Sequence, residues 1–418
     1  MQDQTTNISR RSQLIEVAAL FLRLGFTAFG GPAAHVAIMR DEVVKKRKWI
    51  TEQEFLDLFG AANMIPGPTS TETAIYLGYR RVGWIGLVLA GICFILPAML
   101  IVMILSWAYI HYGSTRWAIG ILYGIMPVVM AIIAQALWGL GTKAVKNWLT
   151  GVTGLGAVIL YMLGVNILII LLFAGMVVMI GENLSRIKNI PMAGIFMSLR
   201  ASVSERGNLL SKYAMRLPQP LRGLAMTSSQ QFAINGLSLL AASTSFSLIL
   251  LFLNFLKVGA TLYGSGYVLL AYLRADFVLN LGWLTDKQLI DAIAIGQITP
   301  GPVFTTATFI GYLLGGIPGA LIATLGIFLP SFIYVGISGL FIKGIRNSPW
   351  ASSFLDGVNA ASLGLMLAVS IQLASTALID PITIGVAVIC LIILIRFQTN
   401  STWLIAGGAL IGLLHTIL

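Results

Sequence analysis

Four long apolar runs constrain this chain more than any other feature of its sequence. They cover residues 84–110, 117–139, 318–341 and 358–378. Each run is long enough for an α-helix that crosses about 30 Å of hydrocarbon, which takes roughly 18 to 25 residues. Charged residues make up only 10% of the chain, whereas a soluble domain carries about 25%. The sequence therefore predicts an all-α polytopic membrane protein in contact with a lipid bilayer.

The net charge of +11 does not indicate a nucleic-acid partner, because most Lys and Arg residues lie between apolar runs, where they set membrane orientation. Both cysteines, Cys93 and Cys390, lie inside apolar runs. They can build neither a disulfide framework nor a metal cluster. We expect no cofactor, no metal and no enzyme activity, since no catalytic cluster of His, Cys and acidic residues is evident. The polar segment Met1–Arg11 lacks a following signal-like stretch, so we expect the whole chain to be the mature one.

The chain also contains an internal repeat, and a repeat determines the architecture of the whole fold. A shift of 234 positions matches Phe21, Leu22, Gly25, Thr27, Gly30, Arg40, Trp49, Thr51, Asp57, Pro66, Gly67 and Pro68 with identical residues. After a one-residue deletion, a shift of 233 matches Gly78, Tyr79, Gly83, Gly86 and Pro97. We therefore predict a first transmembrane repeat at 1–181 and a second at 231–418, with about five spans each.

Basic residues predict that the two repeats have opposite orientations in the membrane. The linker 182–230 has seven basic residues against two acidic ones, which places it in the cytoplasm by the positive-inside rule. The loop Arg40–Lys48 holds five basic and two acidic residues, whereas its counterpart, Arg274–Gly282, holds one of each. We expect an inverted repeat in the inner membrane of the cell. Arg10 and Arg11 oppose this topology unless the first helix is broken.

Two matched segments, residues 52–79 and 286–312, are too polar and too interrupted for a single span. Each contains Pro-Gly-Pro, namely Pro66, Gly67 and Pro68 or Pro300, Gly301 and Pro302. We interpret them as re-entrant helix pairs, because inverted repeats place substrate at such matched interruptions. The alternative is a tight loop outside the membrane. Asn63 and Gln297 favour re-entrance, since they precede the turns in apolar surroundings.

A helix that starts after Pro-Gly-Pro leaves several N–H groups unpaired, and these attract an anion. Hydroxyls that can add to such a site are those of Thr69, Ser70, Thr71, Thr305 and Thr306. The first helix, Phe21–Arg40, is interrupted by Gly30, Gly31 and Pro32 before His35, and the second copy keeps Gly264. These glycines indicate either a substrate site or close helix packing.

Ionisable residues at membrane depth are functional candidates. Arg23 and Lys257 occupy matched positions, where they either neutralise an anion or extend toward the interface. Glu72 is a candidate for a coupling proton, or a partner of an Arg such as Arg80. Matched Asp57 and Asp291, together with His35, are candidates for coupling or for charge pairs.

Three segments carry distinctive motifs, namely FGGPAAHVAIMRDEV at 29–43, WITEQEF at 49–55 and NMIPGPTSTETAIYLGYRRVGWIGLVLAG at 63–91, with a degenerate second copy at 255–330. In these segments the chain resembles the chromate ion transporter family in its long, two-domain form. This resemblance implies secondary transport that exports chromate and gives chromate resistance, linked to sulfate exchange or to the proton gradient. Another oxyanion as substrate, a passive anion channel, a cation transporter and a homodimeric assembly remain open.

Overall fold

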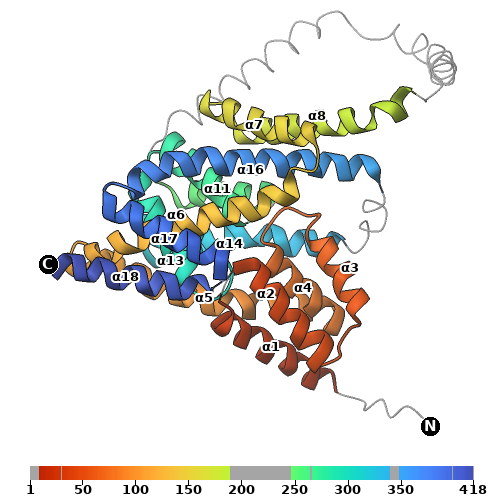
Figure 1. Cartoon of the computed structure of the whole chain (residues 1–418). Helices are drawn as coiled ribbons and strands as arrows, with labels where there is room; N and C mark the ends of the chain where they lie inside the picture. The colour runs from red at the N-terminus through yellow and green to blue at the C-terminus, as the bar shows by residue number, and fades with distance from the viewer. Residues whose placement is uncertain are drawn as a thin grey trace, which may run out of the picture. The chain divides into compact units, whose positions relative to one another are not determined.

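The computed structural model describes residues 9–29, 31–188, 246–263, 266–338, 348–397 and 399–417 (Figure 1). Every regular element in these residues is a helix. The chain divides into one compact unit, formed by Met1–Met179 and Ser247–Leu418, and a second unit, Ile180–Phe246. Most of the predicted linker, residues 189–230, lies outside the described residues. The cavity described below and its lining residues belong to the first unit.

The first half begins with short helices and continues with long ones. Its helices are α1 (Arg10–Thr27), α2 (Gly31–Arg40), η1 (Asp41–Lys46), α3 (Glu52–Ala62), α4 (Thr69–Val82), α5 (Trp84–Tyr112), α6 (Arg116–Ala144), α7 (Trp148–Met162) and α8 (Ile167–Lys188). The predicted interruption of the first helix is present, because α1 ends at Thr27 and α2 begins at Gly31. Pro32 is the second residue of α2, where its missing N–H removes no helical hydrogen bond.

The second half follows the same order. Its helices are α11 (Leu248–Thr261), η3 (Gly266–Val268), α12 (Leu269–Leu273), η4 (Arg274–Asn280), α13 (Asp286–Ile298), η5 (Val303–Thr305), α14 (Thr306–Ser338), α16 (Pro349–Ala377), α17 (Pro381–Phe397) and α18 (Ser401–Ile417). Helix α14 kinks at Gly315 and Gly316, where the backbone leaves helical geometry. Gly316 matches Gly83, which separates α4 from α5, so α14 corresponds to those two helices together.

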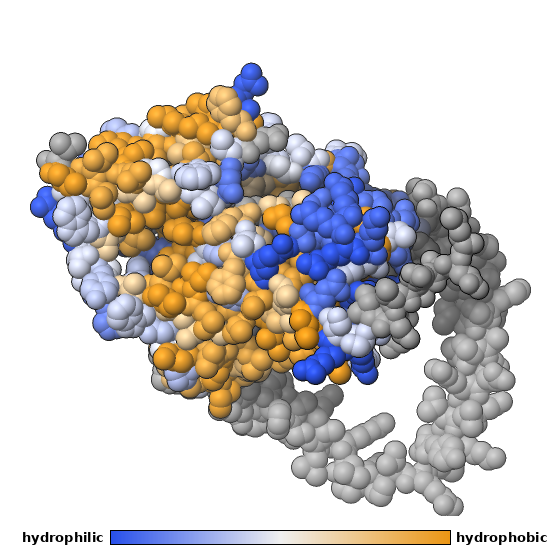
Figure 2. Space-filling model, turned by 90° about the horizontal axis from the view of Figure 1, so that it is seen from below, coloured by the Kyte–Doolittle hydropathy of each residue, from blue (hydrophilic) through white to orange (hydrophobic). Residues whose placement is uncertain are grey.

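The expected all-helical fold with several membrane spans is confirmed. Five segments of the described chain are long and apolar enough to cross a membrane, namely 84–112, 116–144, 167–184, 303–338 and 349–377. The remaining apolar helices α7, α11, α17 and α18 have 14 to 17 residues. On the face shown in Figure 2, hydrophilic residues gather in one area and hydrophobic residues cover much of the rest. Such exposed apolar surface suits contact with lipid.

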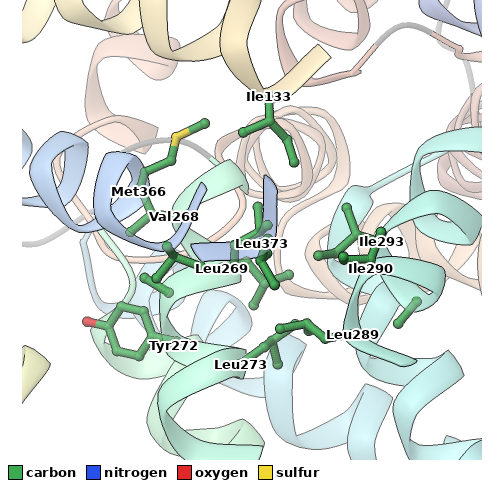
Figure 3. Close-up of a cluster of buried hydrophobic side chains, with 14 of the residues drawn as sticks. Ile133, Val268, Leu269, Tyr272, Leu273, Leu289, Ile290, Ile293, Met366 and Leu373 are labelled. Carbon is green, nitrogen blue, oxygen red and sulfur yellow. The ribbon is translucent and has the colours of Figure 1, made fainter. Parts of the chain in front are cut away.

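The apolar core lies where α6, α12, α13 and α16 meet. Figure 3 shows Ile133, Leu269, Ile290 and Leu373 among its buried side chains. Elsewhere, glycines let helices approach closely: α6 and α18 pack so tightly that a Cβ on Gly124 would overlap the backbone of α18. Small residues at such contacts are the usual basis of helix packing within a membrane, where lipid removes the hydrophobic advantage of burying Leu.

Polar contacts at the ends of these helices recur in both halves. The ion pair of Arg23 with Glu42, at 2.6 Å, is matched by that of Lys257 with Asp276, also at 2.6 Å. Both acids lie in a π-helix, η1 or η4, at positions 234 residues apart. The pairing survives although Arg has been replaced by Lys and Glu by Asp, so the contact itself is what the halves share.

A second recurring ion pair anchors the helix before each Pro-Gly-Pro turn. Arg40 contacts Glu52 at 2.6 Å, and the matched Arg274 contacts Asp286 at 2.8 Å. These helices also begin alike: α3 starts with a capping box of Thr51 and Glu54, and α13 starts with a capping box of Thr285 and Gln288. Two hydrogen bonds, one from the Thr51 backbone N–H and one with a smaller effect from the Arg80 side chain, hold the pKa of Glu54 below its usual value.

Candidate functional site

The two Pro-Gly-Pro turns are buried and held by a reciprocal pair of main-chain hydrogen bonds. The Gly67 N–H donates to the carbonyl of Leu262 at 2.8 Å, and the Gly301 N–H donates to the carbonyl of Ala28 at 3.0 Å. Ala28 and Leu262 are themselves matched positions, each directly after the first helix of its half. Each turn therefore binds the first helix of the opposite half, as in a two-fold symmetric interface.

Each turn also packs against the long helix of the opposite half, at matched positions after a proline. A Cβ on Gly301 would lie 2.8 Å from the Cβ of Ala98 in α5, and one on Gly67 would lie 2.7 Å from Ser331 Oγ in α14. Both glycines have positive φ, 138° at Gly67 and 89° at Gly301. Glycine is thus required twice over, by backbone conformation and by close approach.

The helices that follow the turns begin without side-chain caps. Helix α4 starts after Pro68, and its first helical hydrogen bonds come from the N–H groups of Thr71 and Glu72 to the Pro68 carbonyl. The N–H groups of Thr69 and Ser70 precede them. Helix η5 starts after Pro302 in the same way, and its first bond comes from Thr305. Each start thus leaves donors that lie outside the helical hydrogen-bond pattern.

Both helix starts line one cavity of about 580 Å³. Thr69 and Ser70 contribute from α4, and Val303 and Phe304 contribute from η5. Helices α6 and α16 supply much of the remaining wall. Ser70 and Phe304 are buried, whereas Asn63 and Lys143 at the lining are exposed. The cavity therefore runs from solvent-exposed residues to the buried starts of two helices that come from different halves.

The polar groups of the cavity suit an anion. Lys143, near the C-terminus of α6, is the one charged side chain among the described lining residues. Ser362 on α16 is 1% exposed, and its hydroxyl has no hydrogen-bond partner among the described residues. Asn359 lies one helical turn before it and also lines the cavity. A buried hydroxyl without a partner is unusual and calls for a ligand or water.

Comparison with known proteins identifies the family. The sequence model of the family described as "Chromate transporter" matches residues 15–180 and 249–413, which together cover most of the chain and both of its halves. The chain belongs to the chromate transporter family. The resemblance seen in the sequence motifs is thereby confirmed.

Relatives in this family match the chain over nearly its full length. The chromate transport protein of Cupriavidus metallidurans is 32% identical over 96% of this chain and 92% of its own length. The chromate transport protein of Pseudomonas aeruginosa is 29% identical over 89% of this chain and 84% of its own length. An uncharacterized transporter of Methanocaldococcus jannaschii is 28% identical over 85% of this chain and 83% of its own length. No solved structure matches the chain.

The structure brings several of the predicted site residues of this family member together. Asn63, Pro68, Thr69 and Ser70 line the cavity. Pro66 and Gly67 lie in the buried turn between Asn63 and Pro68, and Pro300, Gly301 and Pro302 form the turn before Val303 and Phe304. Gln297 is buried before the second turn and hydrogen-bonds Tyr267, which lines the cavity.

Other predicted residues lie elsewhere. Arg23 and Lys257 do not line the cavity, and each is held by its carboxylate partner at 2.6 Å. His35 is 1% exposed, and its Nε2 lies 3.0 Å from the same Ala28 carbonyl that accepts from Gly301. Gly31 is the first residue of α2. Gly30 and Gly264 lie outside the described residues.

The three predicted acidic residues have different surroundings. Asp57 accepts a hydrogen bond from Gln53 at 3.3 Å, whereas Asp291 is fully buried and accepts one from Tyr109 at 2.8 Å. Glu72 is fully buried and accepts a bond from Ser331 at 3.4 Å. Arg80, considered as a partner of Glu72, pairs instead with Glu54 at 2.9 Å.

Sequence reasoning did not assign Lys143, Asn359 and Ser362 to the site. Lys143 lies just after the apolar run 117–139, where a basic residue by itself indicates only membrane orientation. Asn359 and Ser362 fall within the apolar run 358–378, three residues apart, which places them on one face of a helix. Polar residues at that spacing in a membrane span were the available signal.

Proposed function

We propose that this chain is a secondary transporter that binds chromate in this cavity and carries it out of the cytoplasm. The observation that carries the proposal is the convergence of two uncapped helix starts, one from each half, on a cavity whose one charged lining residue in the described chain is Lys143. Chromate is a tetrahedral dianion. Unpaired N–H groups, helix dipoles and an ammonium group are the elements that bind such an ion.

The reciprocal hydrogen bonds of Gly67 and Gly301 support an alternating-access mechanism on an inverted repeat. Two halves related by a two-fold axis in the membrane plane present equivalent surfaces to the two sides of the membrane. Rocking one half against the other about the buried turns would then move the cavity opening from one side to the other. Lys143, in the last turn of α6, and Lys146, just after this helix, support a cytoplasmic location of the present opening by the positive-inside rule.

The membrane potential is sufficient to drive export. Moving one charge through 100 mV is worth about 2.3 kcal/mol, so a dianion leaving a cytoplasm that is negative by about 100 mV gains about 4.6 kcal/mol. That free energy corresponds to a concentration ratio of roughly a thousandfold or more. The chain carries no nucleotide-binding motif, which agrees with transport driven by gradients.

Sulfate is the second candidate substrate, because it has the same charge and the same tetrahedral shape as chromate. A site of N–H groups, hydroxyls and one ammonium group reads charge and shape, and these are what the two ions share. We therefore expect sulfate to compete with chromate, with transport of both ions through the same cavity.

The test is uptake of labelled chromate and labelled sulfate by inside-out vesicles that contain the protein. Saturable chromate uptake that excess sulfate inhibits supports a shared oxyanion site. Faster uptake into vesicles preloaded with unlabelled chromate distinguishes a carrier from a passive channel, which shows no such acceleration. Absence of uptake for chromate in vesicles with correctly inserted protein would rule out chromate as the substrate.

A further inference from the structure

Glu72 is a buried acid that the oxyanion site leaves without a role. It lies in the first turn of α4, two residues after Ser70, but it does not line the cavity. Its side chain is fully buried against Gly67, close enough that a Cβ on this glycine would overlap Glu72 Oε1. Oε1 accepts one long hydrogen bond, 3.4 Å from Ser331 Oγ. Oε2 has no hydrogen-bond partner among the described residues.

The groups that face this carboxyl are phenols and a hydroxyl. Tyr76 on α4, Tyr263 after α11 and Tyr334 on α14 are the titratable groups that interact with it electrostatically. The described parts of α5 and α14 bring no charged side chain to it. In the part of the chain that the structure describes, no salt bridge includes Glu72.

Charged residues on the other helices packed against α4 have partners of their own. On α1, Glu16 pairs with Arg81 and Arg47, and Arg23 pairs with Glu42. Arg40 of α2 pairs with Glu52 of α3. Glu54 of α3 pairs with Arg80. His35 of α2 contacts the Ala28 carbonyl, and Asp57 of α3 contacts Gln53. A buried carboxylate with neither a cation nor sufficient donors is strongly disfavoured. Glu72 therefore suits the neutral, protonated form in this arrangement.

The matched contact in the other half contains no acid. Gly301 packs against Ala98, where Gly67 packs against Glu72 and Ser331. The hydroxyls of Thr305 and Thr306, which flank the alignment gap and are the alternative counterparts of Glu72, donate to carbonyls of their own turn. Of the two otherwise equivalent contacts, only one has a group whose charge can change.

We propose that Glu72 is the proton-binding site of the transport cycle. With a proton on its carboxyl, the turn at Pro66–Pro68 packs against Ser331 of α14. Without the proton, the carboxylate needs water, and it obtains water only if this turn separates from α14. Rocking with this turn packed therefore requires a proton on Glu72, and that proton can leave to water once the turn separates from α14. This inference rests on the proposed function for its role in the cycle, but the proton site itself can be tested independently.

The first experiment measures the proton directly in the full-length protein. Infrared difference spectra between neutral and alkaline pH should contain the carbonyl stretch of a protonated buried carboxyl, and Glu72→Gln should remove that band. Asp291→Asn is the matched control, because Asp291 is equally buried but lies away from the turns. If Glu72→Gln leaves the carboxyl carbonyl band of the wild type unchanged in the absolute spectra at both pH values, Glu72 carries no proton and the proposal is wrong, whatever the substrate is.

The second experiment follows protons during chromate transport by the protein in liposomes that contain a pH-sensitive dye, with the membrane potential clamped. Wild-type chromate flux should be accompanied by a change in internal pH. Glu72→Gln should retain exchange of chromate for chromate and lose the pH change. Ser331→Ala should keep the pH change, because the matched residue Ala98 shows that alanine fits there.

The two measurements separate this inference from the proposed function. Chromate flux in the wild type without any pH change would overturn the role of Glu72 in the cycle. A proton on Glu72 in the infrared spectra, together with no chromate flux in any variant, would overturn the proposed substrate and leave the proton site established.

Discussion

Replacing Gly301 with alanine should separate the second Pro-Gly-Pro turn from α5. Any L-residue at its φ of 89° is strained, by about 1–2 kcal/mol. The new Cβ would also lie 2.8 Å from the Cβ of Ala98, which is fully buried. Overpacking of this kind costs about 1–3 kcal/mol more. We therefore expect Gly301→Ala to destabilise the protein by about 2–5 kcal/mol.

Gly282→Ala is the matched control, because Gly282 has a φ of 63° and a Cβ there would meet nothing within 4 Å. This variant has the backbone strain without the overlap. The difference between the two variants, about 1–3 kcal/mol, corresponds to roughly a fivefold to hundredfold change in the equilibrium between packed and separated turns. The free energy of unfolding in mixed detergent micelles measures how far each variant is destabilised.

Initial rates of chromate uptake into liposomes measure the functional consequence. Gly301→Ala should lose most of its uptake at a protein density equal to wild type, whereas Gly282→Ala should retain it. Equal losses of stability and of uptake in the two variants would refute the reasoning, because backbone strain alone would then explain both.

Three further predictions concern the cavity and the ion pairs. Lys143→Ala should weaken chromate binding roughly tenfold, as expected for the loss of one charge near a dianion, whereas Lys146→Ala should leave the dissociation constant unchanged because Lys146 pairs with Asp356 outside the cavity. Ser362→Ala should weaken chromate binding without lowering thermal stability, because the hydroxyl has no partner to lose in the described chain. Arg274→Ala should cost about 2–3 kcal/mol of unfolding free energy, whereas the more exposed Arg40→Ala should cost less than about 1 kcal/mol.

The sequence predicted those features that depend on local composition and on backbone chemistry. Apolar runs became helices because the length and composition of a span are local properties. The helix pairs around Pro66–Pro68 and Pro300–Pro302 were predictable because Pro and Gly interrupt helices by their own geometry. The same interruption predicted a helix that begins at Thr69 and Ser70, and both residues line the cavity.

The remaining features of the site depend on tertiary contacts that single positions do not encode. Arg23 was a candidate for binding an anion, and that role stays a prediction. The structure pairs it with Glu42, which the π-helix η1 brings back beside α1. Lys143 joins the cavity only because α6 packs beside α16, so that α6 lines the same cavity as the start of α4. The reciprocal hydrogen bonds at Gly67 and Gly301 involve main-chain atoms only, so no pattern of side chains could predict them.

That use of main-chain atoms has a consequence for mutational scanning of this chain. Ala28 and Leu262 accept the two hydrogen bonds through their carbonyl oxygens, which every substitution leaves in place. A scan that truncates side chains will thus find little at Leu262 beyond its packing, although one of the two reciprocal hydrogen bonds ends there. Only changes that alter the backbone, at Gly67 or Gly301, will reveal these two hydrogen bonds. Ala28 and Leu262, which accept them, would otherwise be scored only by the packing of their side chains.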